Sequence, residues 1–491
     1  MNIQSLVVLL YFIVVVGATA YGVKKHNKAM QGGGDFSAET FKGGSRIGAV
    51  GLAILVSAGA VSTGTFIACL GKSAAYGPGW MLLLLYIAPV TFAALVLTGK
   101  RMAIVGRRVN ANSLIDIFRA RFDNSKLVVV LLVICTVVFS TASAAGEFVG
   151  GSRAIEASAG IPYRVSLIIF ALIITVYTAL GGMTGVTMVA VIQGFVMLAG
   201  SLILLFGYVH YFGSFEAIFG TLKTVDPALL TPNYGGVTPM LVLFEFWVMY
   251  SLMAVGQPWV VQGSLTYNNT KTMKRAMIIG TIMLLCWGFL FACMGGAAAR
   301  AFDPALDETM VDYATSTLAM GILPAGLGGI VLSAAAGAGQ STIGAIFICV
   351  AGAVVNDVYK RAHPEADAAK LKKVMRITTI CLGVATILIA LTEPSTLHLL
   401  LNFCQGGCAS SILPAIVLAL YWPRMTKQGA AAGMIFGMVF YIVNYSFNII
   451  PVLHNAPMVC TMPITFLIMI LVSRMTEKPS KEVVKTFYCE I

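Results

Sequence analysis

The stretch SAAAGAGQSTIGA, residues 333–345, lies inside an apolar run that extends over about residues 322–355. A run of this length is long enough to cross a bilayer as one helix. Nearly all of its residues are small, and small residues let membrane helices pack closely together. We therefore expect a central helix of an all-α membrane protein, with two adjacent hydroxyls, Ser341 and Thr342, at its middle.

The whole chain has the composition of a membrane protein. Of its 491 residues 58% are hydrophobic and only 11% are charged, whereas a soluble domain carries about 25% charged residues. Hydropathy predicts one integral membrane unit, 1–491, with a short solvated cytoplasmic tail at 475–491 and an irregular outer loop at 213–238. The thirteen predicted spans are 3–23, 47–71, 79–98, 127–149, 164–182, 186–212, 239–261, 275–299, 322–355, 374–391, 396–421, 428–450 and 456–473.

The basic residues predict the orientation in the cell membrane. With the N-terminus outside and the C-terminus in the cytoplasm, 27 of the 32 Lys and Arg residues lie in inner segments, as the positive-inside rule requires. The net charge of +12 is thus explained by topology, and the expected partners are the lipid bilayer and small solutes rather than nucleic acid or an obligate protein. The five His residues are scattered, so an enzyme is not expected.

Two predicted spans are interrupted near their middles. The second contains the small and polar stretch 57–65, and the seventh contains Gly256-Gln257-Pro258. Proline cannot donate the next helical hydrogen bond and glycine weakens a helix, although a simple kink has the same pattern. Each interruption opens a set of five spans, 47–212 and 239–421. Broken helices at matching positions are typical of inverted repeats with a transport site at the membrane midplane.

The hydroxyl pair suggests an ion site. Ala338, Ser341 and Thr342 have i, i+3, i+4 spacing and share one helix face. Their hydroxyls and a freed carbonyl offer oxygen ligands to a small monovalent cation, and the broken second span offers further carbonyls. The alternative is that both hydroxyls bond a carbonyl one turn earlier, as Ser and Thr often do in membrane helices.

Three longer stretches resemble the sodium:solute symporter family: FKGGSR (41–46), YTALGGMTGVTMVAVIQGFVML (177–198) and QSTIGAIFICVAGAVVNDVYK (340–360). Residues 99–122, 150–162 and 264–281 resemble its sodium/pantothenate branch. The resemblance implies a LeuT-type 5+5 inverted repeat with flanking helices, alternating access, and sodium as coupling ion without another cofactor. By position it implies a sodium site formed by the carbonyls of Ala58, Val61 and Ala338 and the hydroxyls of Ser341 and Thr342.

The sequence departs from the family pattern at several positions. Val189 and Ala190 stand where a Thr-Asp pair is usual, Gln340 replaces a Met, and Gln262 replaces an expected Arg. Because the Asp is implicated in sodium coupling in some members, the stoichiometry and the coupling ion stay open.

The expected function is sodium-coupled import of a small organic solute, such as the carboxylate pantothenate. The alternatives are another monocarboxylate, an amino acid or a sugar acid, or a proton-coupled or uncoupled carrier. Glu147 and Glu245 lie at membrane depth and are either carboxylates near the outer interface or groups for coupling or specificity. The expected substrate wall, each member of which has core packing as its alternative, is Ser57, Thr63, Thr65, Ser140, Trp247, Tyr250, Gln257, Asn402 and Gln405.

Overall fold

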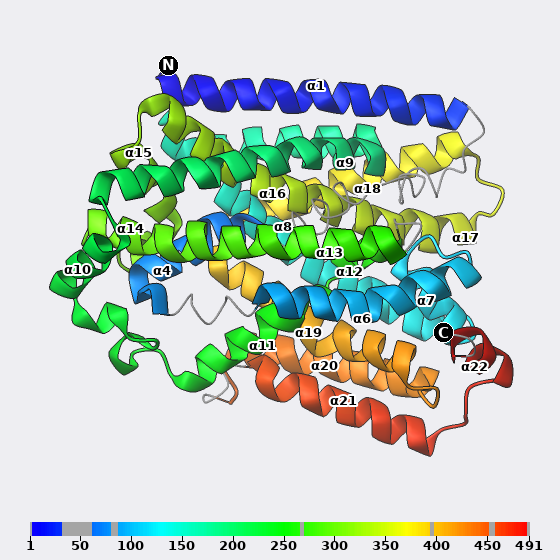
Figure 1. Ribbon diagram of the computed structural model, residues 1–491. Coiled ribbons are helices and arrows are strands. Elements are labelled where there is room, and N and C mark those ends of the chain that lie inside the picture. The colour runs from blue at the N-terminus through cyan, green and yellow to red at the C-terminus, as the bar shows by residue number, and fades with distance from the viewer. Residues whose placement is uncertain are drawn as a thin grey trace.

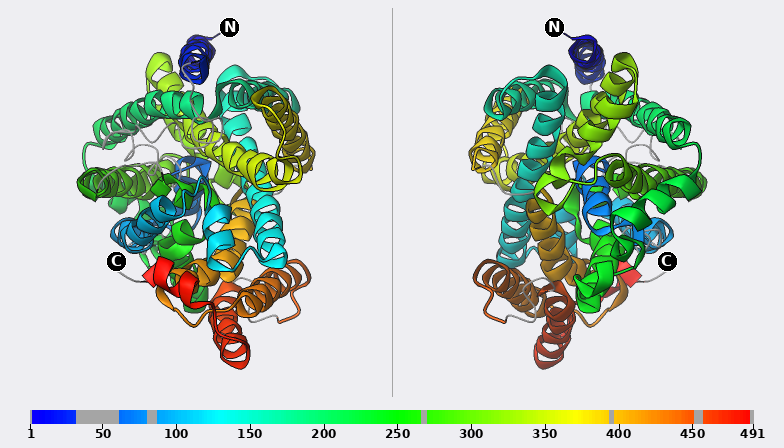
Figure 2. Two further views of the ribbon diagram at one scale, coloured as in Figure 1. Left: turned by 90° about the vertical axis from the view of Figure 1, so that its right-hand side faces the viewer. Right: turned by 90° about the vertical axis from the view of Figure 1, so that its left-hand side faces the viewer.

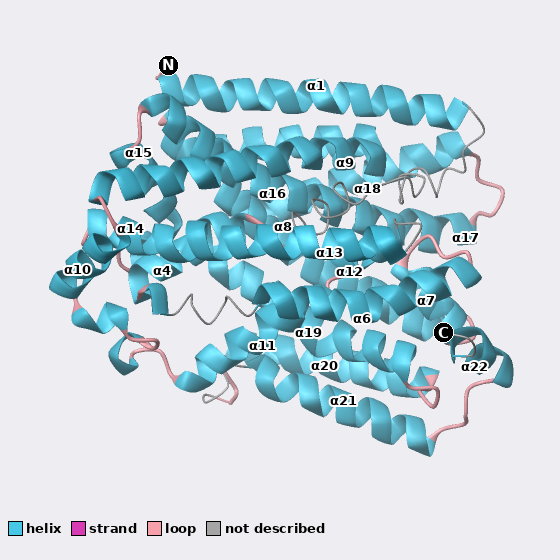
Figure 3. Cartoon of the chain, in the orientation of Figure 1, coloured by secondary structure: helices cyan, strands magenta, loops and turns pink. Residues whose placement is uncertain are grey.

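The structure is a computed structural model that describes residues 2–31, 61–79, 87–265, 270–392, 397–450 and 457–488. Throughout these residues the regular elements are helices (Figure 3). A helix satisfies its backbone hydrogen bonds within its own segment, which is what an apolar environment without water requires.

The long helices run side by side across the molecule (Figure 1). In chain order the helices are α1 (Ile3–Gln31), a π-helix (Gly64–Cys69), α4 (Leu70–Tyr76), α6 (Ile87–Arg108), α7 (Leu114–Arg121), α8 (Lys126–Ala159), α9 (Tyr163–Phe212), α10 (Phe215–Val225), α11 (Met240–Gly256), α12 (Pro258–Gln262), α13 (Thr270–Leu285), a π-helix (Cys286–Cys293), α14 (Met294–Phe302), α15 (Ala314–Ile322), α16 (Ala325–Val354), a π-helix (Val355–Tyr359), α17 (Lys360–Ala362), α18 (Ala368–Ala390), α19 (Leu397–Tyr421), α20 (Lys427–Phe447), α21 (Pro457–Met475) and α22 (Lys481–Tyr488). Short 3-10 turns at Pro227–Leu230, Tyr234–Gly236, Gly263–Leu265 and Glu308–Tyr313 complete the described connections.

The helices reproduce the predicted spans. Ten helices in the described ranges are long and apolar enough to cross a membrane, and each matches one predicted span. The predicted seventh span is α11 followed by α12, while much of the second and part of the third lie outside the described residues. Spans five and six are merged in α9, where Gly182 breaks the helix at φ 54° and ψ −162°. A positive φ of this kind favours glycine, so Gly182 marks the turn between the two spans.

Helix α16 occupies the centre of the bundle. Almost every residue from Gly328 to Ala353 is buried, and α16 packs against α1, α8 and α9. The end-on views of Figure 2 place α1 at one edge of the bundle and α21 at the opposite edge. The stretch of small residues that predicted a central helix therefore lies in the core, with the hydroxyl pair inside it.

Two expectations about the connections were wrong in detail. The loop at 213–238 contains the helix α10, whose N-terminal cap is Ser214, the side chain of which accepts a hydrogen bond from the Ala217 amide at 3.1 Å. The tail at 475–491 contains α22, which buries Val483 and Phe487. Local amphipathicity produced both helices: each has an apolar face that a neighbouring helix covers.

Candidate functional site

The interruption of the seventh predicted span lies where the sequence indicated. Helix α11 ends at Gly256, Gln257 is extended at φ −83° and ψ 111°, and α12 begins at Pro258. A Cβ at Gly256 would lie 2.9 Å from the Cys408 carbonyl oxygen of α19. Glycine therefore allows α11 to end directly against α19, and proline starts the next helix because its missing N–H is not needed there.

The interruption of the second predicted span is described from Val61 onward. Val61 and Ser62 are not helical, and a π-helix begins at Gly64, whose amide donates to Ser62 Oγ at 3.0 Å. Val61 is buried. Ser57 and Ala58, expected at the substrate and sodium sites, lie outside the described residues.

The hydroxyl pair of α16 converges on one carbonyl. Ser341 Oγ donates to the Ala338 carbonyl oxygen at 2.9 Å, and Thr342 Oγ1 donates to the same oxygen at 3.2 Å. All three residues are almost completely buried. This is the local back-bonding considered from the sequence, and it also brings three oxygen atoms together on one face of α16, as an alkali-cation site requires.

The interrupted second span lies directly against α16 and α8 through a contact at Thr63. A Cβ at Gly339 of α16 would lie 2.7 Å from Thr63 Cγ2, and one at Gly150 of α8 would lie 2.6 Å from Thr63 Cβ. Such distances are shorter than real Cβ contacts. Two glycines thus let the segment that contains Val61 and Thr63 approach the helix that carries the hydroxyl pair.

Both membrane-depth acids are buried. Glu147 of α8 is 1% exposed, and its Oε2 accepts hydrogen bonds from Thr63 N at 2.9 Å and Thr63 Oγ1 at 2.8 Å. Glu245 of α11 is 3% exposed; its carboxylate accepts a hydrogen bond from the Met458 amide, while Oε2 has no partner among the described residues. Neither side chain lies on the outer surface of the bundle, and the roles of both acids stay predictions.

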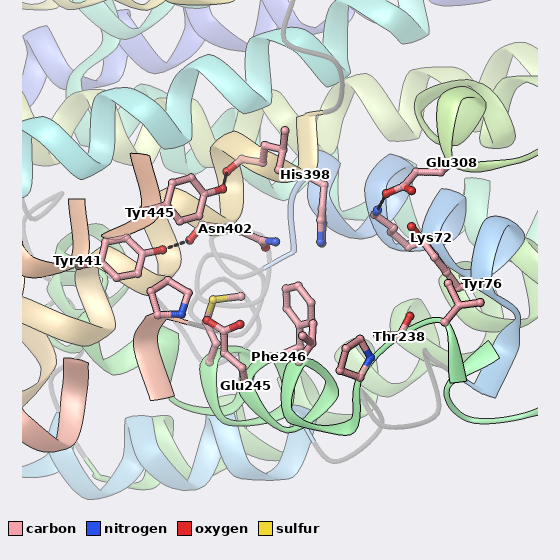
Figure 4. A pocket seen from close by; sticks show the side chains of 16 residues that line it. Lys72, Tyr76, Thr238, Glu245, Phe246, Glu308, His398, Asn402, Tyr441 and Tyr445 are labelled. Atoms are coloured by element: carbon pink, nitrogen blue, oxygen red, sulfur yellow. Dashed lines mark hydrogen bonds and ion pairs between the residues drawn. The ribbon is translucent and has the colours of Figure 1, made fainter. Parts of the chain in front are cut away.

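A cavity of about 630 Å³ opens between α4, α11, α19, α20 and α21 (Figure 4). Glu245 and Asn402 line it, and Tyr441 Oη donates to the Asn402 backbone carbonyl oxygen at 3.0 Å. The full lining is Lys72, Tyr76, Val237, Thr238, Pro239, Val242, Glu245, Phe246, Met249, Glu308, His398, Leu399, Asn402, Tyr441, Tyr445 and Pro457. The cavity thus combines aromatic faces with a few polar groups, as small-molecule sites do.

An ion pair lies in the cavity wall beside the 3-10 turn Glu308–Tyr313. Lys72 Nζ lies 3.0 Å from Glu308 Oε1. A hydrogen bond from Tyr76 and the charge of Lys72 hold the pKa of Glu308 below its ordinary value. Glu308 therefore stays ionised at neutral pH and fixes the Lys72 ammonium at the cavity wall.

Seven of the predicted substrate residues divide into three groups. Asn402 lines the cavity, and its Oδ1 accepts a hydrogen bond from Tyr250 Oη at 3.2 Å. Three buried polar atoms have no hydrogen-bond partner among the described residues: Ser140 Oγ of α8, Gln257 Oε1 just after α11, and Gln405 Oε1 of α19. Helix α19 packs against both α8 and α11. Thr63 is committed to Glu147, and Thr65 is half-buried at the π-helix.

Trp247 does not lie on the face of α11 that lines the cavity. It is half-buried and its ring stacks on Phe244, which is 52% exposed, at a centroid distance of 6.0 Å. The cavity residues of α11 are Val242, Glu245, Phe246 and Met249, which have helical spacing and form another face. The sequence could not assign a face to Trp247 because α11 is apolar on all sides.

A polar cluster beside the hydroxyl pair was not predicted. The Gln340 side-chain carbonyl accepts hydrogen bonds from Tyr11 Oη of α1 and from Gln193 Nε2 of α9, the latter at 3.1 Å. Tyr177 Oη donates to the Gln340 backbone carbonyl at 2.8 Å. Gln340 is one of the departures from the family pattern, and each of its three partners is a Tyr or Gln inside a predicted apolar span.

The comparisons with known proteins fit this arrangement. Residues 40–437 match the family model of the sodium:solute symporter family. The chain belongs to this family. The chain is 34% identical over 447 residues to the sodium/pantothenate symporter of Escherichia coli strain K12, covering 89% of this chain and 90% of that protein. As a family member it is a multi-pass, sodium-coupled solute symporter, not an enzyme.

Other relatives of the symporter differ in the solute named for them. This chain is 26% identical to the osmoregulated proline transporter of Bacillus subtilis, and the match covers 86% of this chain and 90% of that protein. The solved structure of a Na⁺-coupled sialic acid symporter has the same fold, with a TM-score of 0.78 and 17% identity, over 98% of this chain and 99% of that one. The LeuT-type fold class predicted from the sequence is thereby confirmed.

Proposed function

We propose that this symporter imports a small organic carboxylate, pantothenate first among them, together with sodium. The observation that carries the substrate class is the 34% identity to a sodium/pantothenate symporter over nearly the whole chain. The unpartnered oxygens of Ser140, Gln257 and Gln405 support a solute that carries hydroxyl or amide hydrogens.

The sodium site we propose joins α16 to the interrupted second span. The Ala338 carbonyl and the two hydroxyls beside it supply three oxygens, and the carbonyls of Ala58 and Val61 complete the set. The convergence of Ser341 and Thr342 on the Ala338 oxygen supports this site, as does the tight contact of Thr63 with Gly339. Backbone carbonyls are available at an unwound segment because no helical amide takes them.

The cycle we propose starts with sodium binding from the side of the N-terminus, which we assign to the outside. Sodium bridges α16 and the second span and fixes the unwound segment, so the substrate site is formed before the solute arrives. Substrate binding closes the outer path and the two repeats, 47–212 and 239–421, rock against each other. The membrane potential contributes about 2.3 kcal/mol per charge per 100 mV to inward movement of the cation.

The test is uptake by purified protein in liposomes. Labelled pantothenate, small monocarboxylates and proline are offered with an inward sodium gradient or an equal potassium gradient. We expect concentrative pantothenate uptake that needs sodium. Concentrative uptake of proline in place of pantothenate overturns the substrate assignment, and uptake that is equal in both gradients overturns the coupling.

A further inference from the structure

Glu147 is a buried acid that forms no ion pair with any basic residue in the described part of the chain. It lies in the middle of α8 and is 1% exposed. The ion pairs among the described residues involve Lys72, Arg153 and Arg361, and none of them includes Glu147. A charge at membrane depth costs several kcal/mol unless it is compensated, so Glu147 in its ionised form requires a nearby cation as well as hydrogen bonds.

The hydrogen bonds of Glu147 go to the interrupted second span. Oε2 accepts from both the amide and the hydroxyl of Thr63, at 2.9 and 2.8 Å, and Ser62 donates a further side-chain hydrogen bond. Hydrogen bonds to a charged acceptor are roughly twice as strong as neutral ones. Glu147 therefore fixes the non-helical segment whose carbonyls belong to the proposed sodium site.

The same carboxylate lies against the helix that carries the hydroxyl pair. A Cβ at Gly339 would be 3.6 Å from Glu147 Oε2 and 3.2 Å from the Glu147 backbone oxygen. At 100° per residue, Gly339 lies about 60° around α16 from Thr342. Gly339 lies about 160° around the helix from Ser341, so the acid borders α16 on the Thr342 side of the proposed site and acts on a cation there through its charge.

We propose that Glu147 is the anionic positioning residue of the sodium site. It does not ligate the ion; it holds Ser62 and Thr63 against α8 and supplies the negative charge that the neutral ligands lack. Sodium on the α16 side and Glu147 on the α8 side then fix the same unwound segment from two directions. This inference rests on the proposed sodium site and adds a residue from a third helix to it.

The experiment measures the sodium dependence of uptake in proteoliposomes for Glu147→Gln, which keeps the shape and removes the charge. We expect the sodium concentration for half-maximal uptake to rise about 10- to 100-fold, while turnover at saturating sodium changes less than about threefold. Thr63→Val removes one hydrogen bond and should raise the same concentration about tenfold. Thr63→Ser, which keeps the hydroxyl, should restore most of that loss and keeps the test available where Glu147→Gln does not fold.

The matched control is Glu156→Gln, which removes a carboxylate nine residues further along α8, where Arg153 pairs with it. Its sodium dependence should stay within twofold of the wild type. The inference is overturned when Glu147→Gln also stays within twofold, or when turnover falls with unchanged sodium dependence. Wild-type uptake that ignores sodium contradicts the proposed function instead, so the two failures are distinguishable.

Discussion

Gly339→Ala tests the contact between α16 and the interrupted second span. The added methyl carbon would lie 2.7 Å from Thr63 Cγ2, whereas ordinary contacts begin at 3.4 Å. The segment containing Thr63 must therefore move away by about 0.7 Å, or α16 must move by the same amount. Either movement changes the distance between α16 and the second span, which the proposed ion site bridges.

The size of the effect follows from the cost of overpacking, which is about 1–3 kcal/mol for one extra methyl group in a packed core. Replacing glycine by alanine within a helix returns up to about 1 kcal/mol to folding, so the net change in stability is small. This gain in helix propensity does not strengthen sodium binding, because α16 is helical in both the sodium-bound and the sodium-free protein. If about 1–2 kcal/mol falls on the ion-bound arrangement, sodium affinity drops about 5- to 30-fold.

The assay is the sodium dependence of solute uptake, together with the rise in melting temperature that sodium produces in detergent. Gly326→Ala is the matched control, because it lies on the same helix and its added methyl would meet only Ile3 Cγ2, at 3.9 Å. The control should keep the wild-type dependence. If Gly339→Ala and Gly326→Ala give the same half-maximal sodium concentration, the second span does not meet α16 at the ion site and the reasoning fails.

Three further predictions concern other parts of the site. Tyr11→Phe removes a buried hydrogen bond to Gln340 and should lower the free energy of unfolding, measured by denaturant titration, by about 1–2 kcal/mol. The control Tyr21→Phe, at a 61% exposed position on the same helix, should lower it by less than about 0.5 kcal/mol. Equal losses contradict the role of the cluster. Burial raises the pKa of Asp312 to about 6, so the protein is most stable when Asp312 is protonated. Relative to Asp312→Asn, the free energy of unfolding of the wild type should therefore fall by about 2–3 kcal/mol as pH rises from 4 to 7. Parallel pH profiles of stability for the two proteins refute this. Asn402→Ala should raise the KM for the solute about tenfold and leave the half-maximal sodium concentration within twofold; a reversed pattern assigns Asn402 to the ion instead.

The parts of the fold that follow from hydropathy could be predicted from the sequence. The ten long apolar helices match predicted spans because a lipid environment leaves helices as the only way to satisfy the backbone. The interruption at Gly256-Gln257-Pro258 was predictable for a local reason, since Pro258 cannot continue α11. The helices α10 and α22 were missed, because short amphipathic helices carry too few apolar residues for a hydropathy window.

The side-chain partners within the site were harder to predict. The face of α16 followed from the i, i+3, i+4 spacing of Ala338, Ser341 and Thr342. The partner of Glu147 did not, because the acid and Thr63 are 84 residues apart and meet only where two helices pack. A helix that is apolar on all sides, such as α11, gives no periodic signal for which residues face the cavity.

The central claim, that the hydroxyl pair of α16 binds the coupling sodium, is tested most directly by the double variant Ser341→Ala with Thr342→Ala. Uptake into proteoliposomes is measured from low to saturating sodium at fixed membrane potential, with Gly326→Ala as the control on the same helix. The account predicts that the double variant requires at least about 100-fold more sodium for half-maximal uptake, or loses sodium-driven accumulation altogether. A folded double variant with the wild-type sodium dependence would contradict it.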